Sequence, residues 1–170
     1  ETSTDNDEYR GYKELCTDNE DNNKVLADIY NDRTNNTLGL LINEYLLVKD
    51  SSGATVDKMR YTKDGFVNFN NKSIDSKIMG NVKPLDEYQS CLIDSLINNE
   101  MSMVKGRAGS GKTLISLAYA FSMIEKGKYN KLIVFSNPVS SRNSARLGYY
   151  PGTRNEKILD SFVGSMLASK

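Results

Sequence analysis

The chain has 170 residues and a formal net charge of zero, with 22 basic and 22 acidic side chains. It contains no histidine, which excludes His-based catalytic triads and His-ligated metal sites within the chain. Cys16 and Cys91 have no Cys or His companion nearby in the sequence, so we expect free thiols in a reducing cytoplasm. No apolar run reaches the roughly 18 residues of a membrane span, and we expect no membrane partner.

The first 24 residues are polar and acidic, and we expect them to form a solvated tail or linker. Residues 1–32 contain ten acidic and three basic side chains. Such a composition buries too little apolar surface to offset the entropy of ordering the chain. Residues 25–80 have a different pattern, which predicts a small domain made of one helix and a β-meander.

The expected helix of this small domain has an apolar face at helical spacing, formed by Val25, Leu26, Ile29 and Tyr30. Strand-like runs follow at 40–42, 45–48, 55–61 and 66–69. Turn-forming residues at 50–53 and 63–65 separate the later runs and predict a meander of about three strands. Residues 70–84 are rich in Asn, Ser and Lys, and we interpret them as a connection.

A further helix is expected to begin after Asp86, which is a good N-cap, and to bury an apolar face formed by Tyr88, Leu92, Ile93, Leu96 and Ile97. Gln89 follows Asp86 at the spacing of a capping box, so it can serve the helix terminus. An amide also offers a donor and an acceptor to the N6 and N7 atoms of adenine. The sequence leaves both roles open for Gln89.

The most informative segment fits the phosphate-binding pattern G-x-x-x-x-G-K-[ST] at every fixed position and reads Gly106, Arg107, Ala108, Gly109, Ser110, Gly111, Lys112, Thr113. A loop that wraps a polyphosphate turns backbone N–H groups inward, which needs glycines that tolerate positive φ. The helix that follows presents unpaired N–H groups and partial positive charge. The pattern predicts a nucleotide site in which Lys112 reaches the β- and γ-phosphates and the Thr113 hydroxyl binds Mg²⁺.

The segments around this loop predict a strand, a helix and a second strand. Residues 101–104 and 131–135 are apolar runs suited to buried parallel strands. Between them, apolar side chains recur at helical spacing, at Leu114, Leu117, Ala118, Phe121 and Ile124. The expected fold class is α/β, with part of a P-loop NTPase parallel sheet over 81–170 preceded by the small β-rich domain.

Residues 126–157 form a basic stretch that contains seven Lys or Arg side chains and one acid. Ligands meet the loops at the carboxyl ends of parallel strands, so Arg142 and Arg146 are candidate residues for binding the phosphates of a nucleic acid. A merely solvated surface loop explains the same charges. An amphipathic pattern over 156–167 predicts a last helix. No Asp or Glu ends the expected strand at 131–135, so we expect the carboxylates for hydrolysis outside the chain, and no catalytic residue is assigned.

From residue 82 onward the chain resembles the PhoH-like ATPases, whose core is similar to that of superfamily-1 helicases. The matching stretches are 83–89, 104–113, 128–134, 147–153 and 156–157. The combination of Gln89, the phosphate loop and the downstream Gly-Tyr-Tyr-Pro-Gly is far more specific than the loop alone. Residues 11–14 and 43–50 resemble the region that precedes the ATPase in proteins that fuse a PIN nuclease domain to PhoH.

This resemblance implies ATP and Mg²⁺ as cofactors, single-stranded RNA as a partner, a cytoplasmic location and homo-oligomers. It implies that Gln89 contacts adenine, Lys112 the phosphates and Thr113 the metal, and it would place a PIN domain before residue 1. The chain departs from the family pattern at Asn137, where the family usually has an arginine, and at Asn143, where it usually has a glycine. Both departures weaken the case for nucleic-acid contact by this loop.

Three functions therefore stand open. The favoured one is ATP binding, with hydrolysis in the intact protein coupled to RNA binding or unwinding. A P-loop kinase, or an ATPase that acts on a substrate other than nucleic acid, would need the same loop. In the third alternative, the β-rich domain is a binding module and the nucleotide site acts as a regulatory switch.

Overall fold

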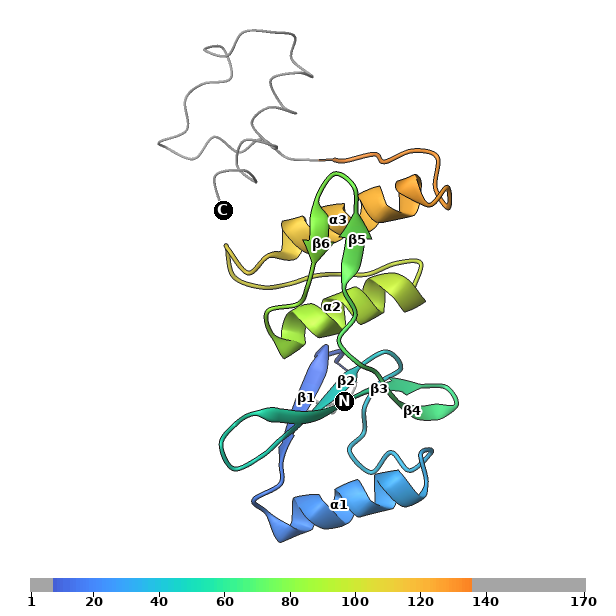
Figure 1. Cartoon of the computed structure of the whole chain (residues 1–170). Helices are drawn as coiled ribbons and strands as arrows, with labels where there is room; N and C mark the ends of the chain where they lie inside the picture. Colours follow the sequence, from blue (N-terminus) through green and yellow to red (C-terminus); the bar gives the residue numbers. More distant parts are fainter. Residues whose placement is uncertain (1–7, 136–170) are drawn as a thin grey trace, which may run out of the picture. The chain divides into compact units, whose positions relative to one another are not determined.

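The structure, a computed structural model, describes residues 8–135 (Figure 1). The chain falls into two compact units that divide between Lys128 and Tyr129. The candidate RNA-binding residues Arg142 and Arg146 and the expected helix at 156–167 lie outside the described residues. The domain boundary expected after residue 80 stays a prediction.

The described residues form a mixed α/β structure, which confirms the expected fold class. In chain order the elements are β1 (Tyr12–Cys16), α1 (Glu20–Asn31), β2 (Tyr45–Lys49), β3 (Thr55–Thr62), β4 (Gly65–Asn68), β5 (Ile74–Ser76), β6 (Gly80–Val82), α2 (Glu87–Asn98) and α3 (Lys112–Glu125). Strands β1 to β4 form one sheet, and β5 and β6 form a second. Among the described helices, none has the length and apolar character that crossing a membrane requires.

The larger sheet has the strand order β1-β2-β3-β4 and combines a parallel pair with a meander. β1 runs parallel to β2, with Tyr12 opposite Tyr45. β2, β3 and β4 are antiparallel neighbours, so the predicted meander is confirmed. The turn between β3 and β4 ends at Gly65, which has a φ of 112°. A Cβ at Gly65 would lie 2.3 Å from the carbonyl oxygen of Arg33, so only glycine fits there.

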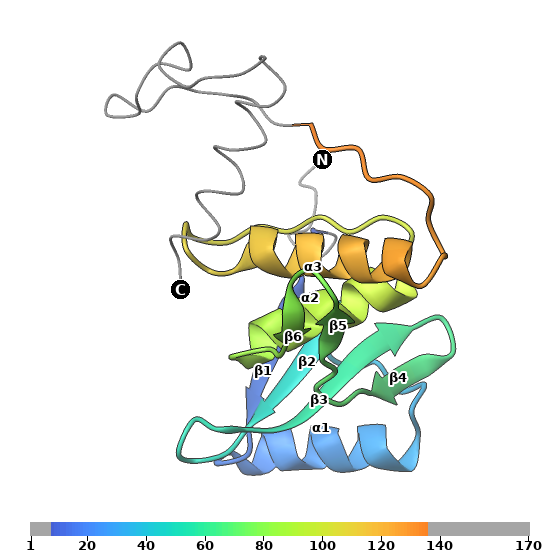
Figure 2. The ribbon, with the colours of Figure 1, turned by 45° about the horizontal axis from the view of Figure 1, so that its top comes forward.

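Different helices cover the two faces of this sheet (Figure 2). α1 packs on one face, where Ile29, Leu46 and Met59 are fully buried. α2 packs on the other face, where Tyr45 and Leu47 form a smaller cluster with Cys91 of the helix. β2 reads as a continuous apolar run because both of its faces are covered.

Ordered structure begins earlier than the expected tail allows. Residues 1–24 include β1 and the start of α1, for which Asn19 is the N-cap. The Asn19 side chain accepts a hydrogen bond from the N–H of Asp21 at 2.9 Å. The composition of this segment does not predict β1, because Leu15 is the only buried side chain of the strand. The backbone of β1 depends instead on pairing with β2, which lies far along the chain. The residues from Tyr12 onward therefore do not form a tail.

Two other local expectations differ from the structure. Residues 40–42 form a loop rather than a strand, because the N–H of Leu40 donates to the Asn36 side chain at 2.9 Å instead of to a strand. The connection at 70–84 contains the hairpin β5–β6. The carboxylate of Glu125 holds this hairpin to α3 by accepting hydrogen bonds from the Lys77 N–H at 2.7 Å and the Ser76 hydroxyl at 3.0 Å.

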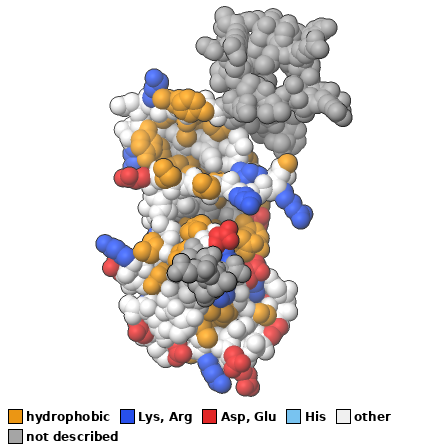
Figure 3. Space-filling view, turned by 180° about the vertical axis from the view of Figure 1, so that it is seen from behind, with side chains coloured by type: hydrophobic (Ala, Val, Ile, Leu, Met, Phe, Trp, Pro, Cys, Tyr) orange, Lys and Arg blue, Asp and Glu red, His pale blue; other side chains and the backbone are white. Residues whose placement is uncertain are grey.

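The two strands expected on either side of the phosphate loop are not formed within the described residues. Residues 101–104 are irregular, and Met101 and Met103 are 89% and 97% exposed. Residues 131–135, in the second unit, are irregular as well. A parallel strand needs partner strands for its backbone groups, and no described strand pairs with either segment. Exposed apolar side chains are visible on the upper part of the surface in Figure 3.

Candidate functional site

The phosphate loop connects the irregular segment 101–105 to α3. Gly111 is the N-cap of α3 and has no side-chain cap. Gly109 and Gly111 both have left-handed backbone, with φ values of 77° and 78°. Residues other than glycine rarely adopt these backbone angles, which explains why glycine occupies both positions. Residues 106–110 are exposed, so a ligand can reach the loop.

The Lys112 side chain folds back over the loop that precedes it. Its ammonium donates hydrogen bonds to the carbonyl oxygen of Gly106 at 2.8 Å, to that of Arg107 and to the Ser110 hydroxyl at 3.1 Å. The positive charge therefore lies within the turn, at the start of α3, where the first N–H groups of a helix have no helical partner. A cation combined with a helix N-terminus favours a bound phosphate.

Thr113, the residue expected to bind Mg²⁺, lies in the first turn of α3 and is exposed. Within residues 8–135, no group of three or more His, Cys, Asp or Glu side chains is placed to hold a metal ion. Ala108 and Arg107 complete the loop, and both are exposed. Gly109 and Gly111 thus have the positive φ that the pattern predicts, whereas the strand expected before the loop is not formed, and the ligand roles of the loop residues stay predictions.

Gln89 joins the start of α2 to the phosphate loop. Its side-chain oxygen accepts a hydrogen bond from the Leu85 N–H at 2.8 Å, and its Nε2 donates to the carbonyl oxygen of Ser110 at 3.2 Å. A Cβ at Gly111 would lie 2.8 Å from this Nε2, so the amide and the loop are in close contact. Asp86 caps the helix as predicted, by accepting the Gln89 N–H at 2.7 Å. The Gln89 side chain serves the helix terminus one residue earlier than a capping box does.

Sequence reasoning missed a buried polar cluster on the face of α2 that meets the sheet. Asp94 is 4% exposed, and its Oδ2 accepts hydrogen bonds from the Tyr45 hydroxyl at 3.1 Å and the Arg60 Nε at 2.9 Å. Burial is the main cause of the raised pKa of Tyr45, followed by the nearby Asp94 charge. The signal was available, because Glu87, Ser90 and Asp94 recur at helical spacing opposite the apolar face.

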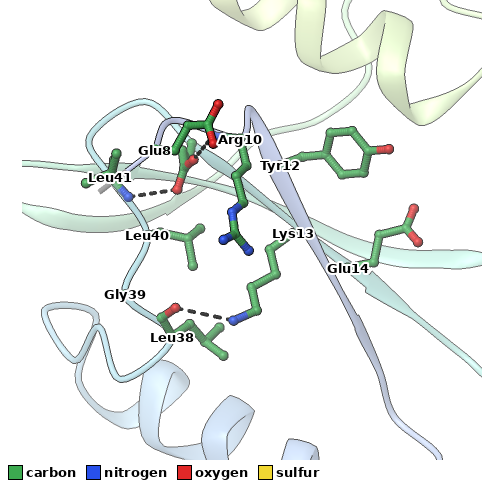
Figure 4. A pocket seen from close by; sticks show the side chains of 10 residues that line it. Glu8, Arg10, Tyr12, Lys13, Glu14, Leu38, Gly39, Leu40 and Leu41 are labelled. Carbon is green, nitrogen blue, oxygen red and sulfur yellow. Dashed lines mark hydrogen bonds between the residues drawn. The ribbon is translucent and has the colours of Figure 1, made fainter. Parts of the chain in front are cut away.

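A separate cavity of about 360 Å³ lies beside β1, and no residue of the phosphate loop lines it (Figure 4). Lys13 closes one side by donating to the carbonyl oxygen of Leu38 at 3.3 Å. Glu44 is 7% exposed, and its carboxylate accepts hydrogen bonds from the N–H groups of Arg10 and Leu41. These contacts join β1 and the residues just before it to the loop after α1.

Comparison with known proteins gives a family match over the part of the chain that holds this site. The family model described as "PhoH-like protein" matches residues 81–166, which is more than half of the chain. The match includes Gln89 and the whole phosphate loop. No solved structure matches the chain.

Two curated relatives are similar to the chain. Protein PhoH2 of Bacillus subtilis (strain 168) is 27% identical over 163 residues, which cover 91% of this chain and 36% of the relative. Protein PhoH2 of Thermobispora bispora is 36% identical over 73 residues, which cover 41% of this chain and 16% of the relative. The chain thus spans only a minor part of the length of either relative.

Proposed function

This chain belongs to the PhoH-like family, a family of nucleotide-binding ATPases, and we propose that its phosphate loop binds ATP together with Mg²⁺. The observation that carries the proposal is the position of the Lys112 ammonium, which lies within a turn formed by left-handed Gly109 and Gly111 at the start of α3. A triphosphate entering this turn would meet a cation, exposed loop N–H groups and the helix dipole.

The loop residues have distinct parts in this proposal. The Lys112 ammonium exchanges its loop acceptors for oxygens of the β- and γ-phosphates. The Thr113 hydroxyl would supply a ligand to Mg²⁺, which when bound would neutralise phosphate charge. The loop from Gly106 to Gly111 offers its N–H groups to phosphate oxygens.

Gln89 is proposed to recognise the adenine base. Its amide makes one hydrogen bond through Oε1 and one through Nε2 within the protein. An amide carries two N–H groups and two oxygen lone pairs, so one donor and one acceptor remain for the N7 and N6 of adenine. The same side chain can thus hold the loop and read the base.

For the intact protein we propose that ATP hydrolysis is coupled to the binding or unwinding of single-stranded RNA. The resemblance of the motifs to PhoH-like ATPases supports this, as does the basic composition of 126–157, which includes Arg142 and Arg146. A cytoplasmic location, homo-oligomers and a preceding PIN domain belong to the same proposal. The catalytic carboxylates are not assigned to any residue of this chain.

The test is ATP turnover by the intact protein, with and without single-stranded RNA. The critical variant is Lys112→Ala, and the matched control is Lys105→Ala, which removes an exposed lysine just before the loop. We expect RNA to raise turnover, Lys112→Ala to abolish it and Lys105→Ala to retain it. Turnover indifferent to RNA would favour a substrate other than nucleic acid. Nucleotide binding without turnover would favour a regulated binding module.

A further inference from the structure

Two faces of α2 are packed, and each contacts a different part of the same compact unit. One face packs on the four-stranded sheet through Glu87, Ser90, Cys91 and Asp94. The other face packs on α3 and β5 through Leu92, Ile93 and Leu96, in a cluster with Ile74, Ile115 and Ala118. Gln89 belongs to this second face by helical spacing and contacts the phosphate loop. The helix therefore connects the sheet to the loop.

The sheet side of this connection centres on the buried Asp94 carboxylate. Tyr45 of β2 and Arg60 of β3 both donate to its Oδ2, at 3.1 and 2.9 Å. Asn98, one turn further along α2, donates to the Oδ1 at 2.9 Å. Asp94 and Arg60 have side chains only 5% and 15% exposed, so the charges are largely removed from water. A buried pair of this kind fixes geometry, because displacement leaves a desolvated charge without its partner.

Two more polar contacts fix the N-terminal half of α2 on the same sheet. Lys49 of β2 forms an ion pair with Glu87, and the hydrogen bond from Lys49 lowers the pKa of that carboxyl group. Lys58 of β3 donates to the buried Ser90 hydroxyl at 3.1 Å. The three contacts span about two turns of the helix. They therefore fix both its position along the strands and its rotation about its own axis.

On the loop side, the connection consists of a close contact between Gln89 and the phosphate loop. Gln89 lies between Glu87 and Ser90, so whatever fixes these residues on the sheet also fixes Gln89. The side-chain Nε2 of Gln89 reaches the Ser110 carbonyl oxygen at 3.2 Å, and a Cβ at Gly111 would lie 2.8 Å from the same Nε2. A shift of α2 away from the loop by about one ångström would stretch this hydrogen bond beyond its normal range. The position of the loop therefore depends on how α2 sits on the sheet.

We propose that Asp94, held by Arg60 and Tyr45, is a positioning residue for the phosphate loop. By fixing α2 on the sheet it holds Gln89 against Ser110, so the small β-rich domain forms part of the nucleotide site at a distance. The consequence for nucleotide affinity rests on the proposed ATP binding. The consequence for the order of the loop does not, because it follows from contacts within the protein alone.

A matched pair of variants tests the proposal in the intact protein. Tyr45→Phe removes the hydroxyl that donates to Asp94 on the α2 side of the sheet. Tyr30→Phe removes a hydroxyl that donates to the Asp57 carboxylate, which joins α1 to β3. Each variant loses one phenol–carboxylate hydrogen bond and keeps the aromatic ring. Any difference between them in the loop therefore reports the connection through α2.

The first measurement is amide hydrogen exchange without nucleotide at Ser110 and Ile115, whose N–H groups donate to the carbonyl oxygens of Arg107 and Gly111. We expect Tyr45→Phe to speed exchange there by about three- to tenfold and Tyr30→Phe to leave it unchanged. The second is the Kd for ATP, which Tyr45→Phe should raise by a similar factor. In a Gln89→Ala background, Tyr45→Phe should cause no further increase in the Kd for ATP, because the hydrogen bond from Gln89 to Ser110 is already absent.

Equal exchange in the two tyrosine variants would overturn the proposal. So would a Kd increase from Tyr45→Phe that persists undiminished in the Gln89→Ala background, because Asp94 would then not act through Gln89. If the wild-type protein binds no ATP, the proposed function fails, and the exchange measurement still decides whether Asp94 positions the loop.

Discussion

The two faces of the four-stranded sheet are attached to their helices by different physical means. The α1 face is an apolar interface, centred on fully buried Ile29 and Met59. The α2 face has a small apolar cluster surrounded by ion pairs and hydrogen bonds, among them Arg60 with Asp94. Burial of apolar surface contributes a large stabilising free energy that does not depend on direction, whereas buried polar contacts require a fixed geometry. We infer that the α1 face supplies stability and the α2 face supplies position.

The largest effect is expected from Ile29→Ala, which would break the α1 face. Ile29 is fully buried, so removing its side chain beyond Cβ leaves a cavity between α1 and the sheet. The free energy of unfolding should fall by about 2–5 kcal/mol in a denaturant titration. Ile42→Ala, at a side chain 57% exposed, is the control and should change it by less than about 1 kcal/mol. Similar losses in both variants would contradict an apolar α1 face.

Arg60→Met should have the next largest effect, and it tests the polar character of the α2 face. The variant leaves the Asp94 carboxylate buried without its cation, which should lower the free energy of unfolding by about 1.5–3 kcal/mol. Adding Asp94→Leu removes the unpaired charge and should restore most of the loss. Thermal unfolding of the single and double variants checks this. A double variant less stable than Arg60→Met would contradict a cost from the unpaired buried carboxylate.

Gly65→Ala is expected to have a comparable or smaller effect, on the α1 side of the comparison. The new Cβ would lie 2.3 Å from the Arg33 carbonyl oxygen, in a residue with a φ of 112°. The backbone must move, at a cost of about 1–3 kcal/mol in the free energy of unfolding. Gly53→Ala is the matched control, because Gly53 has a φ of 80° and open space around it. A cost at Gly53 equal to that at Gly65 would leave only the backbone angle as the cause.

The smallest effect concerns pH and the Lys49–Glu87 pair. The Lys49 hydrogen bond lowers the pKa of Glu87 in the folded state below the ordinary glutamate value of 4.5. The pair therefore contributes stability above pH 4.5, and this contribution is lost as the pH falls through the folded-state pKa. Because both side chains keep some exposure to solvent, 14% for Lys49 and 22% for Glu87, we expect less than about 1 kcal/mol. Unfolding curves of wild type and Glu87→Gln should differ at pH 7 and converge near pH 3, and a constant difference would refute this assignment.

Much of the fold could be predicted from the sequence because it depends on local patterns. The apolar face of α1, the turns of the meander and the Asp86 cap all act within a few residues. The phosphate loop was predictable for the same reason, since its glycines set their own backbone angles. The contact of Gln89 with the loop could not be predicted in this way, because it joins residues 21 positions apart in the chain.

What the sequence did not reveal depends on partners far along the chain. β1 is mostly exposed and owes its place to pairing with β2. The apolar runs at 101–104 and 131–135 have strand-like composition, and no described strand pairs with them. The polar residues of α2 recur at helical spacing, so the sequence shows that they share a face. It does not show that this face is buried, because that depends on contacts with Arg60 and Tyr45 in another part of the chain.

The most direct test of the central claim is equilibrium binding of Mg²⁺–ATP to the intact protein by titration calorimetry. The account predicts saturable binding that Lys112→Ala weakens by about a hundredfold or more, because the ammonium within the loop is lost. Lys105→Ala should bind like the wild type. Equal affinity of wild type and Lys112→Ala would contradict a nucleotide site at this loop.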